Sequence, residues 1–170
     1  MDTGSPGRAD DELARRMGTV LDAAVEVLAV DDVGVMLLDD GDELRVLGAS
    51  GAAGRSLEDA QIEAGAGPGT DAVRLGRPVL VPDVAEAPDY ARVWELLRDA
   101  DGAHAARAVL SVPVLVDGVV VGNFNALRIE PSAWTDDEVR AVQAYAVAVG
   151  AVLRQAALAS RSRAEPVDPS

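Results

Sequence analysis

Residues 107–128, RAVLSVPVLVDGVVVGNFNALR, contain two apolar runs separated by the dipeptide Asp117-Gly118. Asp-Gly favours a type I′ turn, because both central residues of that turn need a positive φ and its twist matches that of paired strands. The stretch therefore predicts a long β-hairpin closed by Val116 and Val119. Both faces of the hairpin are largely apolar, so both need cover, and the hairpin belongs in the middle of a layered domain.

Counting outward from the turn predicts which residues of the hairpin face one another. Ser111 is expected opposite Phe124 on one side of the hairpin. Asn123 and Asn125 are expected on the other side. Polar side chains on a central strand are costly to bury without partners, so they either bond the backbone of a neighbouring loop or point into a cavity. Under this register the serine and the two asparagines cannot line one pocket.

One long helix is expected near each end of the chain. Residues 11–29 carry apolar side chains at a 3.6-residue period. Near the other end, Thr135 and Glu138 have the spacing of a capping box, which predicts a helix that starts there and runs to about residue 159. This second helix is apolar on more than one face, so the sheet alone cannot cover it. The first helix and a second copy of the protein are the expected partners.

Shorter elements fill the chain between the first helix and the long hairpin. Residues 33–38 and 44–50 predict a second hairpin. The segment 51–106 predicts four short elements, which are a turn or two of helix at 57–62, a helix at 70–75 with Thr70 as a candidate N-cap and Gly76 as the residue after its end, a strand at 78–81, and a helix at 91–100. The polar tails, residues 1–10 and 161–170, are expected to be disordered, which leaves residues 11–160 as one domain.

Composition limits the class of protein. The 29 Asp and Glu residues outnumber the 15 Lys and Arg residues, and a formal charge of −14 disfavours direct binding to nucleic acid or to an anionic membrane. The chain has no Cys, which excludes disulfides, thiolate metal sites and thiol catalysis. No run of 18 apolar residues and no signal peptide is recognisable, so we expect a cytoplasmic protein without a membrane span.

The candidate chemical motifs favour structural interpretations. Glycines at 65, 67 and 69 do not match a phosphate-binding spacing, and Pro68 removes a donor N–H from that loop. His104 is the only histidine, which makes a metal or haem site a poor expectation, and we interpret it as a loop residue. The acidic runs at 39–42 and 136–137 lack the ligand spacing of a calcium loop. No catalytic residue, metal site or cofactor is therefore predicted.

Four strings of residues resemble the GAF domain family over about residues 11–158. They are DVGVMLLD at 32–39, GP at 67–68 with DAVRLGRPV at 71–79, SVPVLVDG at 111–118, and GNFNA at 122–126. They are most similar to GAF domains of actinobacterial regulators that carry an RNA-binding ANTAR domain, although no ANTAR-like helical region follows residue 159. The resemblance implies an α+β fold with an antiparallel sheet of five to six strands in the order 2-1-5-4-3. It also implies that the terminal helices cover one face, and that short helices, loops and a ligand pocket cover the other.

The resemblance also limits the ligands. GAF domains that carry a bilin attach it through Cys, and free-methionine-sulfoxide reductases of this fold use Cys, so a chain without Cys belongs to neither group. We therefore expect a non-enzymatic, stand-alone sensory or regulatory domain that dimerises through its terminal helices. The alternative is a degenerate adaptor with a collapsed pocket that acts only through protein contacts. Residues expected to line a ligand pocket are Val81, Asp83, Trp94, Val109, Ser111 and Phe124.

Overall fold

The computed structural model describes residues 6–164. Its helices and strands, with three short 3-10 turns labelled η, follow in the order α1 (Pro6–Leu28), β1 (Asp32–Leu38), β2 (Leu44–Ala49), α2 (Ala52–Ala64), α3 (Pro68–Leu75), β3 (Val79–Val81), η1 (Val84–Glu86), η2 (Pro88–Tyr90), α4 (Ala91–Asp101), η3 (Gly102–His104), β4 (Ala108–Val116), β5 (Val119–Arg128) and α5 (Asp136–Ala164).

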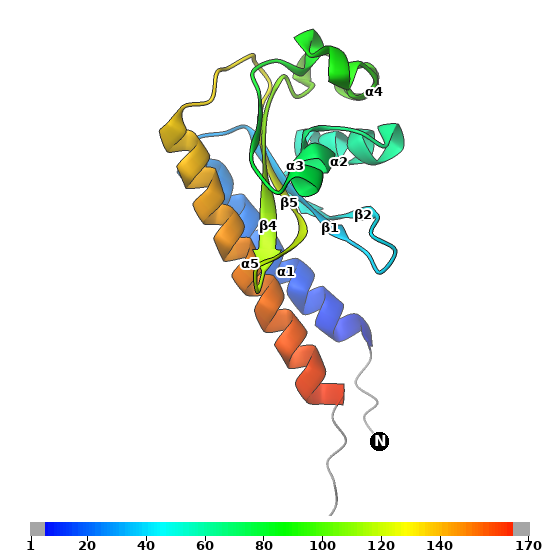
Figure 1. Ribbon diagram of the computed structural model, residues 1–170, viewed down its shortest axis with the longest axis vertical. Helices are drawn as coiled ribbons and strands as arrows, with labels where there is room; N and C mark the ends of the chain where they lie inside the picture. The colour runs from blue at the N-terminus through cyan, green and yellow to red at the C-terminus, as the bar shows by residue number, and fades with distance from the viewer. Residues whose placement is uncertain (1–5, 165–170) are drawn as a thin grey trace, which may run out of the picture.

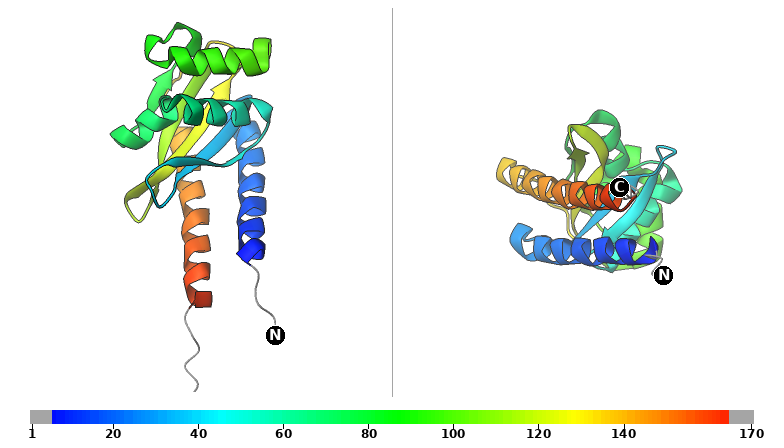
Figure 2. Two further views of the ribbon diagram at one scale, coloured as in Figure 1. Left: turned by 90° about the vertical axis from the view of Figure 1, so that its right-hand side faces the viewer. Right: turned by 90° about the horizontal axis from the view of Figure 1, so that it is seen from below.

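The five strands form one antiparallel sheet in the order β2-β1-β5-β4-β3, as expected. The terminal helices α1 and α5 lie side by side on one face and run in opposite directions, whereas α2, α3 and α4 lie on the other face (Figure 1). Both terminal helices extend past the end of the sheet at their chain-terminal ends (Figure 2). The molecule therefore has a helical layer, a sheet, and a cap made of shorter helices.

The long hairpin is confirmed, and so is its turn. Asp117 and Gly118 have φ values of 50° and 79°, which are the two positive values that a type I′ turn needs. Val116 pairs with Val119 and Leu115 with Val120, as the sequence predicts.

The predicted register is wrong beyond this point, because a β-bulge at Val121 shifts the pairing by one residue. Val114 pairs with Gly122, and Ser111 pairs with Asn125 rather than with Phe124. Gly122 explains why the shift is tolerated, since a Cβ there would lie 2.1 Å from the carbonyl oxygen of Met36. A one-residue shift exchanges the two faces of a strand, so Ser111, Asn123 and Asn125 all lie on the same face.

The corrected register gives the sheet two distinct cores. Under α1 and α5 the buried residues include Phe124, Val112 and Leu110 from the central strands, packed with Leu21 and Val149 from the helices. On the cap side a second cluster is formed by buried residues from the sheet, α2 and α4, including Val109, Leu127, Leu57, Val93 and Leu97.

The two terminal helices are longer than expected. The capping box at the start of α5 is confirmed, because the Glu138 N–H donates to Thr135 Oγ1 at 3.2 Å and the Thr135 N–H donates to Glu138 Oε2 at 2.9 Å. Of the tails expected to be disordered, residues 6–10 belong to α1 and residues 161–164 belong to α5. Residues 1–5 and 165–170 lie outside the described residues.

The middle of the chain is more helical than the sequence suggested. The helix α2 has 13 residues rather than one or two turns. The helix α3 begins at Pro68, so its N-cap is Gly67 and the expected N-cap at Thr70 is wrong. Proline fits a first helical position, because its fixed φ suits the helix and its missing N–H would have no partner there. The expected glycine after this helix is confirmed, since Gly76 has a φ of 64°. His104 is exposed, as expected of a surface residue, but it belongs to the 3-10 turn η3 and not to a loop.

The helix α5 is unusually apolar for its position. Among the described residues it is the one helix whose length and mean hydropathy of 1.3 reach those of a membrane span. Core helices pass the same test, and α5 buries Val142, Ala146 and Val149 against the sheet. Only 22% of its most apolar window is buried, however, which leaves much apolar surface uncovered.

Candidate functional site

A row of polar residues crosses the centre of the sheet on the cap side. Gly34, Asn125 and Ser111 are neighbours on β1, β5 and β4. The Ser111 hydroxyl donates to Asn125 Oδ1, and Asn125 Nδ2 donates to Glu58 Oε1 at 2.7 Å. Gly34 makes room for the carboxyl group, because a Cβ there would lie 2.3 Å from Glu58 Oε1. Ser111 thus bonds Asn125, and Asn125 bonds the buried Glu58 side chain from α2, so neither of them bonds a loop backbone.

Glu58 is fully buried, and this burial raises its pKa to about 8 from the usual 4.5. Water is removed from the charged form, and the nearby carboxylates of Asp59 and Asp32 add to the effect. The hydrogen bond from Asn125 and the charge of Arg55 act in the opposite direction but are weaker than desolvation. Glu58 is therefore protonated at neutral pH, and α2 lies over the sheet with a neutral carboxyl group beneath it.

A second polar group joins α2 to the start of α3. The Gly69 N–H donates to Gln61 Oε1 at 2.7 Å, so the glutamine carbonyl satisfies a donor in the first turn of α3. Asn123 lies directly beneath, since a Cβ on Gly69 would be 2.5 Å from Asn123 Nδ2. Both amide side chains are buried. Gln61 Nε2 and both amide atoms of Asn123 have no hydrogen-bond partner among the described residues.

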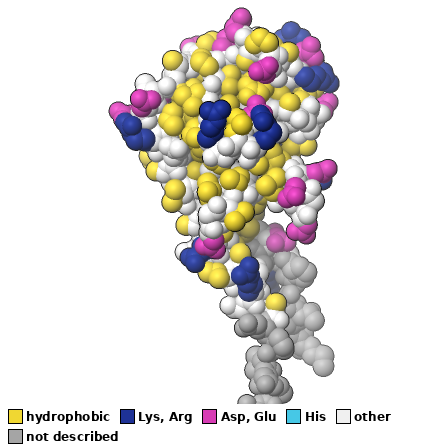
Figure 3. Space-filling view, in the orientation of Figure 1, with side chains coloured by type: hydrophobic (Ala, Val, Ile, Leu, Met, Phe, Trp, Pro, Cys, Tyr) yellow, Lys and Arg dark blue, Asp and Glu magenta, His cyan; other side chains and the backbone are white. Residues whose placement is uncertain are grey.

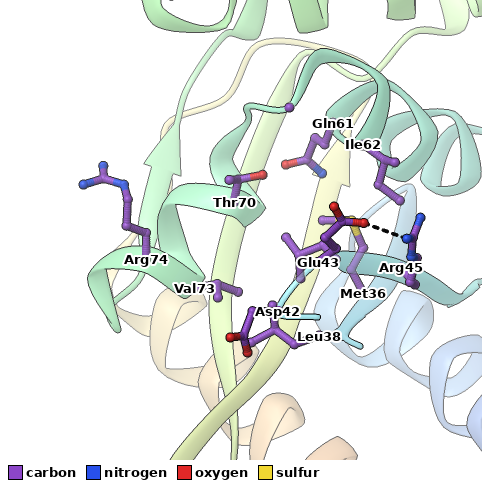
Figure 4. A pocket seen from close by; sticks show the side chains of 12 residues that line it. Met36, Leu38, Asp42, Glu43, Arg45, Gln61, Ile62, Thr70, Val73 and Arg74 are labelled. Atoms are coloured by element: carbon purple, nitrogen blue, oxygen red, sulfur yellow. Dashed lines mark hydrogen bonds and ion pairs between the residues drawn. The ribbon is translucent and has the colours of Figure 1, made fainter. Parts of the chain in front are cut away.

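Gln61 lies at the inner end of a cleft of about 520 Å³ between the β1–β2 hairpin and the helices α2 and α3. Figure 4 shows Gln61 and Thr70 on the helical side of the cleft, with Met36 on its floor. The apolar lining is completed by Leu38, Leu44, Ile62 and Val73. A volume of this size is typical of small-molecule sites, and so is a mostly apolar lining with a few polar groups.

The rim of the cleft carries two arginines that are already paired with carboxylates. Arg45 contacts Asp39 at 2.9 Å and Glu43 at 2.7 Å, and the second of these pairs is visible in Figure 4. Arg74 contacts Asp71 at 3.3 Å. The backbone hydrogen bond from Glu43 lowers the pKa of Asp39, and the hydrogen bond from the Arg45 guanidinium lowers it further. The rim therefore presents little uncompensated positive charge.

The six residues predicted to line a pocket do not come together. Phe124 lies on the opposite face of the sheet, where it stacks on Tyr145 of α5 with ring centroids 6.3 Å apart. Ser111 belongs to the polar row, and Val109 is part of the cap-side core. Val81 and its neighbour Asp83 line a groove of about 380 Å³ beside β3.

Asp83 and Trp94 do meet, on either side of one arginine. Asp83 accepts two hydrogen bonds from Arg107, at 2.7 and 2.6 Å, and the Arg107 guanidinium lies 5.2 Å from the centre of the Trp94 ring. The hydrogen bond from Arg107 also lowers the pKa of Asp83. The three side chains tie the loop before α4 to the start of β4.

Glu58 and Gln61 were not predicted as site residues, although both lie within the turn of helix expected at 57–62. One face of α2 buries Gly54, Leu57, Glu58 and Gln61. Their spacing of three, one and three residues is helical, and this was the available signal. Among residues 6–164, no group of three or more His, Cys, Asp or Glu side chains is placed to bind a metal ion.

Comparison with known proteins identifies the family. A GAF domain model matches residues 12–153, and the chain belongs to the GAF domain family. GAF domains are sensory and regulatory domains of signalling proteins, and this is the class that the fold defines. No curated protein sequence matches the chain.

Solved structures agree with this assignment. A domain of a two-component sensor histidine kinase protein from Sinorhizobium meliloti is 18% identical, with a TM-score of 0.69 over 86% of this chain and 94% of that one. The GAF domain of the cyanobacteriochrome TePixJ, from Thermosynechococcus elongatus, is 26% identical, with a TM-score of 0.65 over 82% and 88%. A type II free methionine-R-sulfoxide reductase from Thermoplasma acidophilum is 16% identical, with a TM-score of 0.66 over 86% and 96%.

Proposed function

We propose that this chain is a non-enzymatic sensory domain that binds a small molecule in the cleft beside Gln61 and transmits binding through a homodimer of its terminal helices. The observation that carries the proposal is the uncovered apolar face of α5. Ala144, Val147, Ala148 and Ala151 repeat at helical spacing on the side of α5 that points away from the sheet, and all four are exposed. Val147 is 73% exposed, which is costly for an apolar side chain unless a partner covers it.

The surface around this face supports pairing of two chains. Apolar side chains are spread over much of the face that presents β4 and α5 (Figure 3). Patches of this kind are typical of interaction sites. The outer face of α1 is instead polar, with Asp11, Arg15, Thr19 and Asp22 exposed on it. We infer that α5 is the helix that meets the second copy.

A path from the cleft to the helical layer runs through β2. Leu44 and Arg45 of this strand line the cleft. Further along the same strand, Gly48 packs on Leu21 of α1, where a Cβ on the glycine would lie 3.4 Å from the leucine side chain. A ligand that binds one position of the β1–β2 hairpin more tightly would therefore favour one position of α1 beside α5.

The absence of an activated nucleophile supports a non-enzymatic role. The sequence has no Cys and a single His, and that His is exposed on η3. Glu58 is the one buried acid with a strongly raised pKa among the described residues, and its carboxyl group bonds Asn125 beneath α2 instead of lining the cleft. The formal charge of −14 supports a protein that makes no direct contact with nucleic acid or with an anionic membrane.

Val147→Asp is expected to convert the dimer into a monomer. A carboxylate in the centre of an apolar interface would lose its hydration without gaining a partner. The measurement is sedimentation velocity of the full chain at concentrations of about 1 to 100 μM, which covers ordinary interface affinities. Thr19→Asp places the same charge on the polar outer face of α1 and should leave the dimer intact. A wild-type chain that remains monomeric across the series would contradict the proposal.

A second candidate function is a protein-binding adaptor without a ligand. The observation that favours it is the filled centre of the cap side, where Glu58, Asn123 and Asn125 are completely buried between the sheet and the cap helices. The cleft beside Gln61 lies toward the edge of the sheet and opens to solvent. Absence of any small-molecule binding in a chain that still dimerises would favour this adaptor role.

A further inference from the structure

We propose, on the basis of the sensory role inferred above, that the cleft binds a neutral aliphatic molecule with one carbonyl group. The carbonyl oxygen accepts a hydrogen bond from Gln61 Nε2, and the aliphatic chain lies on the floor around Met36. An aliphatic amide, ester or lactone has this chemistry. Three independent features of the cleft lead to it: a fixed donor, an aliphatic lining and paired rim charges.

The donor is fixed by the helix beside it. The amide oxygen of Gln61 accepts from the Gly69 N–H at 2.7 Å, which settles the orientation of the amide group. Its nitrogen is then the atom left for a ligand, and Nε2 has no partner among the described residues although Gln61 is only 1% exposed. A buried donor without a hydrogen-bond partner destabilises the folded chain. A ligand acceptor removes this cost, so the site favours molecules with a carbonyl group.

The lining favours an aliphatic ligand over an aromatic one. The apolar wall consists of Met36, Leu38, Leu44, Ile62 and Val73. None of the described residues that line the cleft is aromatic, so a heteroaromatic ring would find no partner for stacking. Met36 adds a flexible thioether that adapts to chains of different shape.

The rim favours a neutral ligand. Arg45 and Arg74 are each bonded to carboxylates, and Asp42 and Glu43 also line the cleft. A carboxylate or phosphate ligand would compete with these existing pairs and would face additional negative charge. A neutral carbonyl group has neither cost.

The test is an NMR titration of the ¹⁵N-labelled full chain with three probes of similar size, which are octanamide, octanoate and 1-naphthamide. Octanamide is expected to shift the side-chain NH₂ resonances of Gln61 and the backbone resonances of α2 and α3 in a saturable way. Octanoate and 1-naphthamide are each expected to bind at least about tenfold more weakly, because one lacks a neutral head group and the other an aliphatic chain.

Variants locate the site. Gln61→Glu keeps an oxygen for the Gly69 N–H but replaces the donor by an acceptor, and should weaken octanamide binding at least about tenfold. Val73→Trp fills the cleft from its wall and should abolish binding. It tests the site independently of whether Gln61→Glu folds. Gln143→Glu makes the same chemical change on the exposed surface of α5 and should leave binding unchanged.

The ligand class is overturned if octanoate or 1-naphthamide binds as tightly as octanamide, if folded Gln61→Glu or Val73→Trp binds octanamide like the wild type, or if octanamide shows no saturable binding. These outcomes are separate from failure of the proposed function. A different probe that saturates the same cleft leaves the sensory role standing, and the dimer is measured by sedimentation without any probe.

Discussion

The free energy of unfolding is expected to fall as the pH rises from about 5 to about 9, and Glu58→Gln is expected to remove much of this fall. Burial raises the pKa of Glu58 to about 8, whereas the same carboxyl group titrates near 4.5 when the chain is unfolded. The folded chain therefore holds a proton that the unfolded chain releases in this range. The stability that this proton contributes is fully present below the unfolded pKa of 4.5 and is lost as the pH rises through the folded pKa of about 8.

The expected size of the effect follows from the two pKa values. The free energy of unfolding falls by up to about 1.4 kcal/mol for each pH unit between 4.5 and about 8, so its full loss approaches about 5 kcal/mol. Glutamine has nearly the same shape, keeps the oxygen that accepts from Asn125 and cannot ionise. The variant should therefore match the wild type near pH 5 and exceed its stability by several kcal/mol near pH 9.

Urea unfolding at a series of pH values measures this difference directly. Glu63→Gln is the matched control, because Glu63 lies on the same helix but is exposed. Its stability should follow the wild-type pH curve with only a small offset. A difference between Glu58→Gln and the wild type that stays constant from pH 5 to pH 9 would show that Glu58 is not held neutral.

Phe124→Ala is expected to cost about 3–5 kcal/mol of stability, which is typical of a buried phenylalanine. The side chain is completely buried among residues of the sheet, α1 and α5, and it stacks on Tyr145. Trp94→Ala should cost clearly less, because Trp94 is half-buried at the rim of the cap beside Arg107. Urea midpoints of the two variants provide the comparison. Equal costs would contradict the assignment of Phe124 to the core beneath the terminal helices.

The hairpin at 107–128 shows what local sequence can establish. Asp117-Gly118 determines the turn, and the apolar runs on either side determine that both faces are covered. The bulge at Val121 could not be read in this way. The adjacent Gly122 lies close to Met36, which is on a strand more than 80 residues earlier in the chain. Local patterns do not contain such long-range contacts.

The one-residue shift at Val121 also changes which residues share a face of the sheet, and so where the candidate site was expected. With the unbulged register, Phe124 shared a face with Ser111, and the two asparagines lay on the opposite face. The bulge places Asn123 and Asn125 under α2 and α3 and places Phe124 under α5. The cleft is lined by Gln61 of α2 and Met36 of β1, which are distant in the sequence and come together only in the folded chain. The fold class was therefore predictable from sequence, but the lining of the site was not.

The two faces of the sheet differ in what covers them. The cap side holds a polar layer with a neutral Glu58 and the cleft beside Gln61, whereas the helical side holds an apolar core and the uncovered face of α5. The β1–β2 hairpin contacts both sides, because β2 lines the cleft and packs on α1. A sensor built in this way would change helix packing without moving the centre of its sheet.

The pairing of two α5 helices is tested most directly by cross-linking, because the chain has no Cys and each introduced thiol is unique. Ala144→Cys, Ala148→Cys and Ala151→Cys place thiols along the outer face of α5, and Thr19→Cys places one on α1. After mild oxidation, at least one of the three α5 variants should form a disulfide-linked dimer, since this bond needs Cα atoms within about 7 Å. Thr19→Cys should stay monomeric in denaturing gels. Dimers that form with Thr19→Cys and with none of the α5 variants would contradict the account.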